Sequence, residues 1–322
     1  MKLSPIICLI LLTSSLMTHA RHSIIPDPVR PGDTIAIVSP AGIARAADVY
    51  GAADVLQSRG YHVSVAPSAL AVHGTYAGSD SARLADLRAA WLDPSVKAII
   101  CSRGGYGAVH LLDSLDAVPL AFNAKWLVGF SDITCLHSLM GKHGIASVHG
   151  PMCSYISRDE GRNPDALKLI SLLEGADVID YRVEHHELNR PGSATGRLVG
   201  GNMSVLQGLI GTPYDVIRPG TILIVEDIAE PIYKIERILW QLKMSGVLSQ
   251  LAGLIVGDFT DYEPDPNHPT MEAMIADMVR DYTYPVVFGV PVGHDGRSLP
   301  LLLNAPVTLT VTDSLTTLRQ CF

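Results

Sequence analysis

The stretch Lys125-Trp126-Leu127-Val128-Gly129-Phe130-Ser131-Asp132-Ile133-Thr134 decides how the fold is read. Residues 126–130 form an apolar run too short and uniform for an amphipathic helix, so they predict a buried strand. From Asp132 onward apolar residues recur at helical spacing, and Gly144 supplies a stop. Ser131 therefore lies on a predicted strand-to-helix turn, which presents a side chain at the carboxyl edge of a sheet, beside free N–H groups of the helix.

Two interpretations of Ser131 stay open at this point. Its position suits a catalytic nucleophile, but Gly129-Phe130-Ser131-Asp132-Ile133 lacks the second glycine of the usual G-x-S-x-G elbow. Serine at the start of a helix is also a common N-cap, which would give Ser131 a purely structural role.

Strand and helix patterns alternate around this turn. Strands are predicted at 33–39, 61–66 and 96–101, and helices at 46–58 and 81–92. Such alternation is typical of a parallel sheet covered on both faces, so residues 21–155 should form an open α/β domain that carries Ser131.

The regular alternation of strand and helix patterns ends after His149-Gly150-Pro151. An isolated helix at 163–174 and a polar stretch at 181–195 predict a connecting segment over residues 156–192. Residues 193–322 should form the second domain, with predicted helices at 202–210, 231–244 and up to 280, strands at 221–226, 254–257 and 286–292, and a β-rich tail at 301–311.

The first twenty residues have the pattern of a secretory signal peptide. Lys2 precedes an apolar core from Pro5 to Leu12, and Ala20 stands before a plausible cut at Arg21. The core is too short for a stable membrane anchor, and no later run is long enough to span a bilayer. We therefore expect an exported, periplasmic protein without stable membrane insertion. Lipidation of Cys8 stays open.

Removal of these 20 residues from the 322-residue chain leaves 302, and because Lys2 is their only charged side chain the net charge goes from −8 to −9. That length suits two domains with ample cores. An acidic chain is repelled by phosphates, so a nucleic-acid partner is not expected.

The cysteines at 101, 135, 153 and 321 predict neither a disulfide framework nor a metal site. Cys101 and Cys135 lie in apolar strand and helix patterns, as buried thiols do. No C-x-x-C or H-E-x-x-H occurs, and adjacent residues of His185-His186-Glu187 would point to opposite faces of an extended chain. That stretch is best interpreted as a solvated loop, and no metal or other cofactor is expected.

Two further polar residues end buried strands, as Ser131 does. Glu226 follows the apolar run 222–225 and His294 follows 290–293, so both stand where strands deliver side chains to a crevice. A nucleophilic serine needs a base, and the base needs a carboxylate that holds its tautomer. Ser131, His294 and Glu226 could fill these three roles.

Each of the two partners also has a structural interpretation. Glu226 could cap a helix or pair with a cation, and Asp227 and Glu230 are close enough in sequence to compete for its role. His294 could simply belong to the turn that Asp295 and Gly296 continue.

The loop Arg103-Gly104-Gly105-Tyr106-Gly107 follows a predicted buried strand. It could hold a phosphate, but its G-G-x-G spacing is not a dinucleotide fingerprint, and it lacks the Lys-Ser/Thr pair of a P-loop. Its glycines could instead bring backbone N–H groups close to a reacting carbonyl.

Further segments extend this set across nearly the whole mature chain: Arg30-Pro31-Gly32-Asp33, Ser39-Pro40-Ala41-Gly42, Leu136-His137, His149-Gly150-Pro151-Met152, Leu188-Asn189-Arg190-Pro191-Gly192, Gly196-Arg197-Leu198-Val199-Gly200-Gly201-Asn202, Gly211-Thr212-Pro213-Tyr214, Glu226-Asp227-Ile228 and Gly289-Val290-Pro291-Val292-Gly293-His294. In this order the chain resembles the serine LD-carboxypeptidases, or muramoyl-tetrapeptide carboxypeptidases, which remove the terminal D-alanine from murein tetrapeptides.

The resemblance implies Ser131 as nucleophile, His294 as general base and acid, and Glu226 as orienting carboxylate. It also implies a flavodoxin-like parallel-sheet N-terminal domain, a smaller β-rich α/β C-terminal domain that carries the Glu and the His, a site between the two, and usually a homodimer.

The resemblance further implies an oxyanion hole made by backbone N–H groups of Gly104, Gly105 and Asp132. A substrate with a free terminal carboxylate also needs a positive group near the site. Arg103 is the nearest candidate in sequence, although its side chain could equally be a structural ion-pair partner.

Two features depart from the family. Familiar members act on recycled muropeptides in the cytoplasm, whereas this chain begins with a predicted signal peptide. The tail after His294, residues 295–300, is shorter than the family leads us to expect, so substrate contacts there are not transferred.

Two rival functions are weighed against this one. A same-fold hydrolase that inactivates peptidyl-nucleotide antibiotics would need an aromatic pocket for the base, and the polar stretch 181–195 offers only Tyr181. An exported solute-binding protein would also have two α/β lobes around a cleft, but it would have no need to retain Ser131, Glu226 and His294 together.

Overall fold

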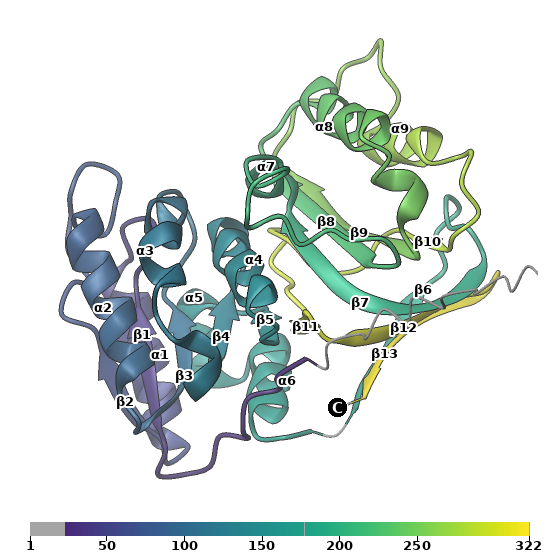
Figure 1. Cartoon of the computed structure of the whole chain (residues 1–322). Coiled ribbons are helices and arrows are strands. Elements are labelled where there is room, and N and C mark those ends of the chain that lie inside the picture. Colours follow the sequence, from purple (N-terminus) through teal and green to yellow (C-terminus); the bar gives the residue numbers. More distant parts are fainter. Residues whose placement is uncertain (1–22, 177, 322) are drawn as a thin grey trace, which may run out of the picture.

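A computed structural model describes residues 23–176 and 178–321, which form two lobes, each built on one sheet (Figure 1). The predicted signal peptide, residues 1–20 with Cys8, lies outside the described residues. No helix within the described part is long and apolar enough to cross a bilayer. The four described cysteines are free thiols, and Cys101, Cys135 and Cys153 are buried.

The first lobe contains a six-stranded sheet of order β11-β5-β4-β3-β1-β2. Its strands are β1 (Thr34–Val38), β2 (His62–Val65), β3 (Val96–Cys101), β4 (Trp126–Gly129), β5 (Ser147–His149) and β11 (Leu301–Leu303). The pairs from β2 to β5 are parallel, and only β11 is antiparallel to its neighbour. The predicted flavodoxin-like parallel sheet is confirmed.

Helices cover both faces of this sheet, which explains why nearly every position of β3 is buried. One core contains apolar side chains of α1 (Ala46–Ser58), α5 (Cys153–Ile156) and α6 (Pro164–Leu173). The core on the opposite face contains those of α2 (Asp80–Leu92), α3 (Leu112–Asp116) and α4 (Thr134–Lys142).

The second lobe contains a seven-stranded sheet of order β10-β9-β8-β7-β12-β13-β6. Its strands are β6 (Val178–Glu184), β7 (Gly192–Asn202), β8 (Ile222–Ile228), β9 (Gly253–Thr260), β10 (Val286–Val287), β12 (Pro306–Val311) and β13 (Leu315–Cys321). The half from β7 to β10 is parallel and the other half antiparallel. Helices α7 (Met203–Gln207), α8 (Ile232–Met244) and α9 (Met271–Met278) add their apolar faces to the core on one side of the parallel half.

The structure differs from the predicted division of the chain at two places. Residues 178–184, predicted as part of the connecting segment 156–192, form the edge strand β6, in which Ile179 and Val183 are buried on one face. Residues 301–303, predicted within the second domain, return to the first sheet as β11 and pair with β5. The return covers an edge that β5 would otherwise expose, and it ties the second lobe to the first.

Candidate active site

Ser131 lies where β4 ends, on a strained backbone. Its φ of 65° is in the left-handed region, which costs a residue with a Cβ about 1–3 kcal/mol. Residues Ser131–Ile133 form a 3₁₀ turn that leads into α4, so the predicted strand-to-helix turn is present. Within the described residues the Ser131 hydroxyl makes no hydrogen bond and caps neither turn. The N-cap interpretation of Ser131 is therefore wrong.

The glycine loop after β3 lies directly against this serine. A Cβ built on Gly104 would stand 2.7 Å from Cβ and 2.8 Å from Oγ of Ser131, so only glycine fits there. Among the described residues, neither Gly104 nor Gly105 donates its N–H to a hydrogen bond. The loop thus brings the backbone of Gly104 against the hydroxyl and contains two free N–H donors, Gly104 and Gly105, for the oxyanion hole that the resemblance implies.

Glu226 and His294 reach the same place from the second lobe. The ring Nδ1 of His294 lies 2.8 Å from Oε2 of Glu226, whose side chain is fully buried, whereas that of His294 is 16% exposed. This hydrogen bond occupies Nδ1 and leaves Nε2 for another partner. The ring of His294 also packs on Phe130, the neighbour of Ser131, with 5.0 Å between centroids.

The pair shifts the pKa of both members. Burial of the His294 ring lowers its pKa, but the hydrogen bond and charge of Glu226 outweigh burial and hold it above its usual value. Burial raises the pKa of Glu226, and the hydrogen bond and charge of His294 oppose that rise. A base whose pKa is raised in this way accepts a proton more readily.

The acidic neighbours that could have competed with Glu226 are bound elsewhere. Both oxygens of Asp227 accept hydrogen bonds, Oδ1 from the Asn202 amide at 2.8 Å and Oδ2 from the Ser204 hydroxyl at 2.8 Å. Glu230 pairs with Lys234 on α8 at 2.7 Å. Glu226 is thus the carboxylate that meets His294.

One buried hydrogen bond joins the two halves of the site. The backbone N–H of Asn202, at the end of β7, donates to Oγ1 of Thr134 at the start of α4, at 3.0 Å. Both residues are buried. The sequence named Asn202 only as part of a matching segment and gave no sign that Thr134 would receive its N–H.

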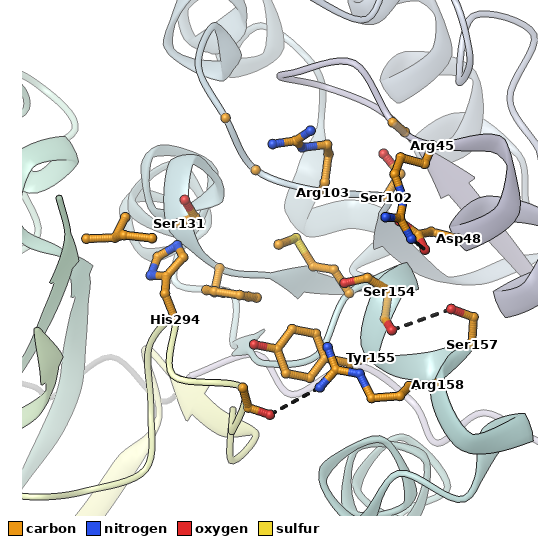
Figure 2. A pocket seen from close by; sticks show the side chains of 17 residues that line it. Arg45, Asp48, Ser102, Arg103, Ser131, Ser154, Tyr155, Ser157, Arg158 and His294 are labelled. Carbon is orange, nitrogen blue, oxygen red and sulfur yellow. Dashed lines mark hydrogen bonds and ion pairs between the residues drawn. The ribbon is translucent and has the colours of Figure 1, made fainter. Parts of the chain in front are cut away.

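Two cavities meet at Ser131. The first has a volume of about 630 Å³ and is lined by His294, Phe130, Tyr155, Arg45, Arg103 and Arg158, among others (Figure 2). The second has about 500 Å³ and is lined by Tyr106, Asn202, Asp227 and Glu230, among others. Gly105, Ser131 and Ile228 line both, whereas His294 lines only the first.

Three guanidinium groups face the first cavity, and their partners differ. Arg45 is bound by both oxygens of Asp48, at 2.9 and 2.8 Å. Arg103 donates to the Ile43 carbonyl at 3.0 Å and forms no ion pair among the described residues, so its ion-pair interpretation is wrong. Sequence reasoning missed Arg158, because an arginine in a polar loop carries no pattern that places it at a site.

In the part of the chain that the structure describes, no metal centre competes with this arrangement. Within residues 23–176 and 178–321 no group of three His, Cys, Asp or Glu side chains is arranged to hold a metal ion. The predicted loop at His185 and His186 is present between β6 and β7; His185 is exposed, whereas His186 is half-buried and its ring stacks on Phe288.

Comparison with known proteins places both lobes in one family. Residues 35–150 match the LD-carboxypeptidase N-terminal domain, and residues 195–309 match the LD-carboxypeptidase C-terminal domain. A relative from Synechocystis is 39% identical, over 88% of this chain and 93% of its own. The murein tetrapeptide carboxypeptidase of Pseudomonas aeruginosa is 32% identical, over 82% of this chain and 89% of its own.

Solved structures agree with this placement. The muramoyltetrapeptide carboxypeptidase from Oxalobacter formigenes superimposes with a TM-score of 0.82 at 31% identity, covering 90% of this chain and 99% of its own. An MccF-like protein from Bacillus anthracis has a TM-score of 0.83 over 93% of this chain and 99% of its own, but at 24% identity it shows the fold alone.

Proposed function

The chain belongs to the LD-carboxypeptidase family, and on that premise we propose that it is a serine-type carboxypeptidase that releases the terminal D-alanine from murein tetrapeptides. One observation carries the assignment of the residues. A strained serine from one lobe and a histidine paired to a buried glutamate from the other line the same cavity.

In the first half of the reaction, Ser131 Oγ attacks the carbonyl carbon of the residue before the terminal alanine while His294 Nε2 takes the hydroxyl proton. The carbonyl oxygen becomes an oxyanion, which the N–H groups of Gly104, Gly105 and Asp132 stabilise. Glu226 holds the ring at Nδ1 and stabilises the imidazolium.

The tetrahedral intermediate then collapses. The bond to the alanine nitrogen breaks, His294 returns the proton to that nitrogen, and D-alanine leaves while the peptide stays esterified to Ser131. In the second half, His294 takes a proton from a water that attacks the ester, and Ser131 leaves with that proton. The residues alone thus complete hydrolysis.

Arg103 is proposed to supply positive charge for the free carboxylate of the substrate. Its guanidinium lies in the first cavity beside the oxyanion loop, and its only side-chain hydrogen bond among the described residues goes to a backbone carbonyl. A carboxylate therefore does not have to displace an ion pair to reach it.

The two rival functions gain less support. The MccF and MccF-like structures are less than 25% identical to this chain in sequence, so they support the shared fold and not the antibiotic substrate. A solute-binding protein gains nothing from a serine held at a costly φ beside two free N–H groups, because a hydroxyl binds ligands equally well from a relaxed backbone.

The test is release of alanine. Purified full-length protein is incubated with a defined tetrapeptide muropeptide, with and without a chelator, and released D-alanine and the remaining tripeptide are measured by mass spectrometry. We expect both products at equal rates in the two samples, and none from Ser131→Ala. Release of another fragment, or activity that needs added zinc, would contradict the proposal.

We also propose that the protein is exported to the periplasm. The support is the pattern of residues 1–20, with Lys2, an apolar core and Ala20. Expression of the chain with a carboxy-terminal tag, followed by fractionation and mass analysis, should yield a periplasmic protein that begins at Arg21. A cytoplasmic product that retains residues 1–20 would refute export.

A homodimer is proposed as the assembly. Its support beyond the resemblance is a stripe of exposed apolar side chains on α8, where Tyr233, Trp240 and Met244 are 57%, 45% and 77% exposed. Light scattering on the wild type should give the mass of two chains, and Trp240→Glu with Met244→Glu should give one. A monomeric wild type would refute the dimer, and a dimeric variant would refute this surface.

A further inference from the structure

The proposed mechanism fixes which cavity receives the leaving residue. The nitrogen of the departing alanine must take its proton from His294, so it has to lie on the His294 side of the scissile bond. His294 lines the first cavity and not the second, and Ser131 stands between them. The terminal residue therefore occupies the first cavity, and the side chain of the residue before it points toward the second.

Arg158 stands in the first cavity with an unneutralised charge. Its Nη1 donates to the carbonyl of Gly296 at 3.4 Å, two residues beyond His294, and among the described residues it has no carboxylate partner. Its guanidinium lies 4.9 Å from the centroid of the Tyr155 ring (Figure 2). That ring packs edge-on against Phe130. Contacts thus lead from Arg158 back to His294 along both the backbone and the stacked rings.

The backbone after Arg158 is strained. Asp159 and Glu160 have φ values of 52° and 53°, and Gly161 follows at 77°, so three successive residues are left-handed. Strain of this kind is kept where the surrounding structure needs a side chain in one place.

We propose that the cleft has a fixed direction, in which Arg158, together with Arg103, binds the carboxylate of the terminal D-alanine and the second cavity receives the side chain of the preceding residue. This inference rests on the proposed function and goes beyond it by naming what recognises each end. Arg158 is a specificity residue that makes the enzyme an exopeptidase, because its guanidinium binds a free carboxylate one residue beyond the scissile bond.

The charge of the second cavity agrees with this direction. Its lining carries the carboxylates of Asp132, Asp227 and Glu230 and no lysine or arginine. Asp132 accepts the Ala108 N–H and Asp227 is hydrogen-bonded throughout. Glu230, with 20% of its side chain exposed, is the accessible carboxylate, and its closest contact with Lys234 on α8 is made by Oε2 and not by Oε1. A carboxylate end would be repelled there, whereas a side chain that ends in an amine would be attracted.

The decisive experiment compares a tetrapeptide that ends in free D-alanine with the same peptide ending in D-alaninamide. The wild type should prefer the free acid by at least about a hundredfold in kcat/KM. Arg158→Gln should raise KM for the acid and reduce that preference about tenfold or more, and Arg158→Lys should restore part of it. Arg162→Gln is the matched control, because Arg162 belongs to the same turn but is 72% exposed and paired with Glu160.

The outcomes separate this inference from the function on which it rests. An Arg158→Gln enzyme that keeps the full preference for the acid would overturn the direction while leaving the carboxypeptidase assignment intact. A wild type that releases alanine from neither peptide would overturn the function itself.

A second comparison tests the other end of the cleft. Peptides with lysine or glutamate before the terminal alanine should differ at least tenfold in kcat/KM in favour of lysine, and Glu230→Gln should reduce that difference. Glu236→Gln removes the same charge from α8 at a residue paired with His268 and should change nothing. Equal rates for the two peptides in the wild type would show that the second cavity does not bind the side chain of the residue before the terminal alanine.

Discussion

The two lobes hold their parts of the proposed site by different means. The first lobe positions Ser131 through its backbone, with φ at 65° and Gly104 pressed against the hydroxyl. The second lobe positions His294 through a side-chain pair, with Glu226 buried beneath the ring. The first lobe relies on a strained backbone and the second on a buried charged pair. Substitutions in the two lobes should therefore affect stability and activity differently.

The difference also lies in how far apart the contributing residues are in sequence. The turn at Ser131 is encoded within ten residues, whereas Glu226 lies within β8 and His294 lies in the loop after β10, which ends at Val287 and not at 292 as the sequence predicts. The serine should therefore keep its geometry whatever happens in the second lobe, while the base requires the whole second lobe to be folded and docked.

The largest effect should come from Ser131→Ala. Loss of the nucleophile should reduce kcat by a factor of about 10⁶, because the groups of a catalytic triad act as a unit. Thermal unfolding of the variant should stay close to that of the wild type, since the hydroxyl makes no hydrogen bond in the described residues. Alanine release above a tenth of the wild-type rate would remove Ser131 from the mechanism.

Ser131→Gly is the matched variant that isolates the strain. It should be equally inactive but more stable than Ser131→Ala by about 1 kcal/mol, because glycine adopts a φ of 65° without the Cβ penalty. Urea unfolding of the two variants measures the difference. Equal stabilities would show that the first lobe stores no strain at this residue.

Glu226→Gln should have the next largest effect. An amide can stabilise neither the imidazolium nor the correct tautomer of His294, and loss of the charge in such a pair costs about 10⁴ in kcat. Asp258→Asn is the control, because Asp258 is close enough for its charge to reach the pair but makes no hydrogen bond to His294. An active Glu226→Gln enzyme would mean that His294 does not need the negative charge of Glu226 for catalysis.

The pH dependence of activity tests whether the charge of Glu226 acts on His294. His294 acts as a base only when it is neutral, and its pKa is raised, so kcat/KM should fall as the pH drops through a value above the usual 6.5. In the residual activity of Glu226→Gln this limb should move to lower pH, because burial then acts on the ring without its partner. A limb that stays in place would assign the titration to another group.

Asp258 is the group most able to imitate this limb. Burial, and the nearby charges of Asp295 and Glu226, raise its pKa to about 6. Asp227 and Asp261 also contribute charge at His294. The profile of Asp258→Asn should therefore keep the wild-type acid limb, and its loss in that variant would show that Asp258 controls the rate.

Sequence reasoning succeeded where the pattern was local. The helix at 46–58 and the strand at 96–101 were predicted with the bounds the structure has, because apolar spacing and a glycine or Asp-Pro stop define both. The turn at Ser131 was predicted for the same reason, although its 3₁₀ character was not.

Long-range pairings could not be predicted in the same way. Residues 301–303 form a short apolar run that would suit either sheet, and only the free edge of β5 decides that they join the first. Strand β6 was missed because its outward face is polar and suggested a linker. Arg158 was missed because its importance comes from Tyr155 and Gly296, which reach it only in the folded chain.

The smallest effect concerns the hydrogen bond between Asn202 and Thr134, which joins the two lobes at the site. Thr134→Val keeps the shape of the side chain but removes the oxygen that accepts the Asn202 N–H, and a buried donor left unpaired costs about 1–3 kcal/mol. We expect a loss of that size in urea unfolding and a fall in kcat of less than tenfold, because Asn202 also binds Asp227, beside Glu226. Thr134→Ser keeps the hydroxyl and should restore most of both. If Thr134→Val lost stability but kept full kcat, the bond would support the lobes without aligning Ser131 and His294. If it lost neither, the lobes would be docked by other contacts, such as the return of β11 to the first sheet.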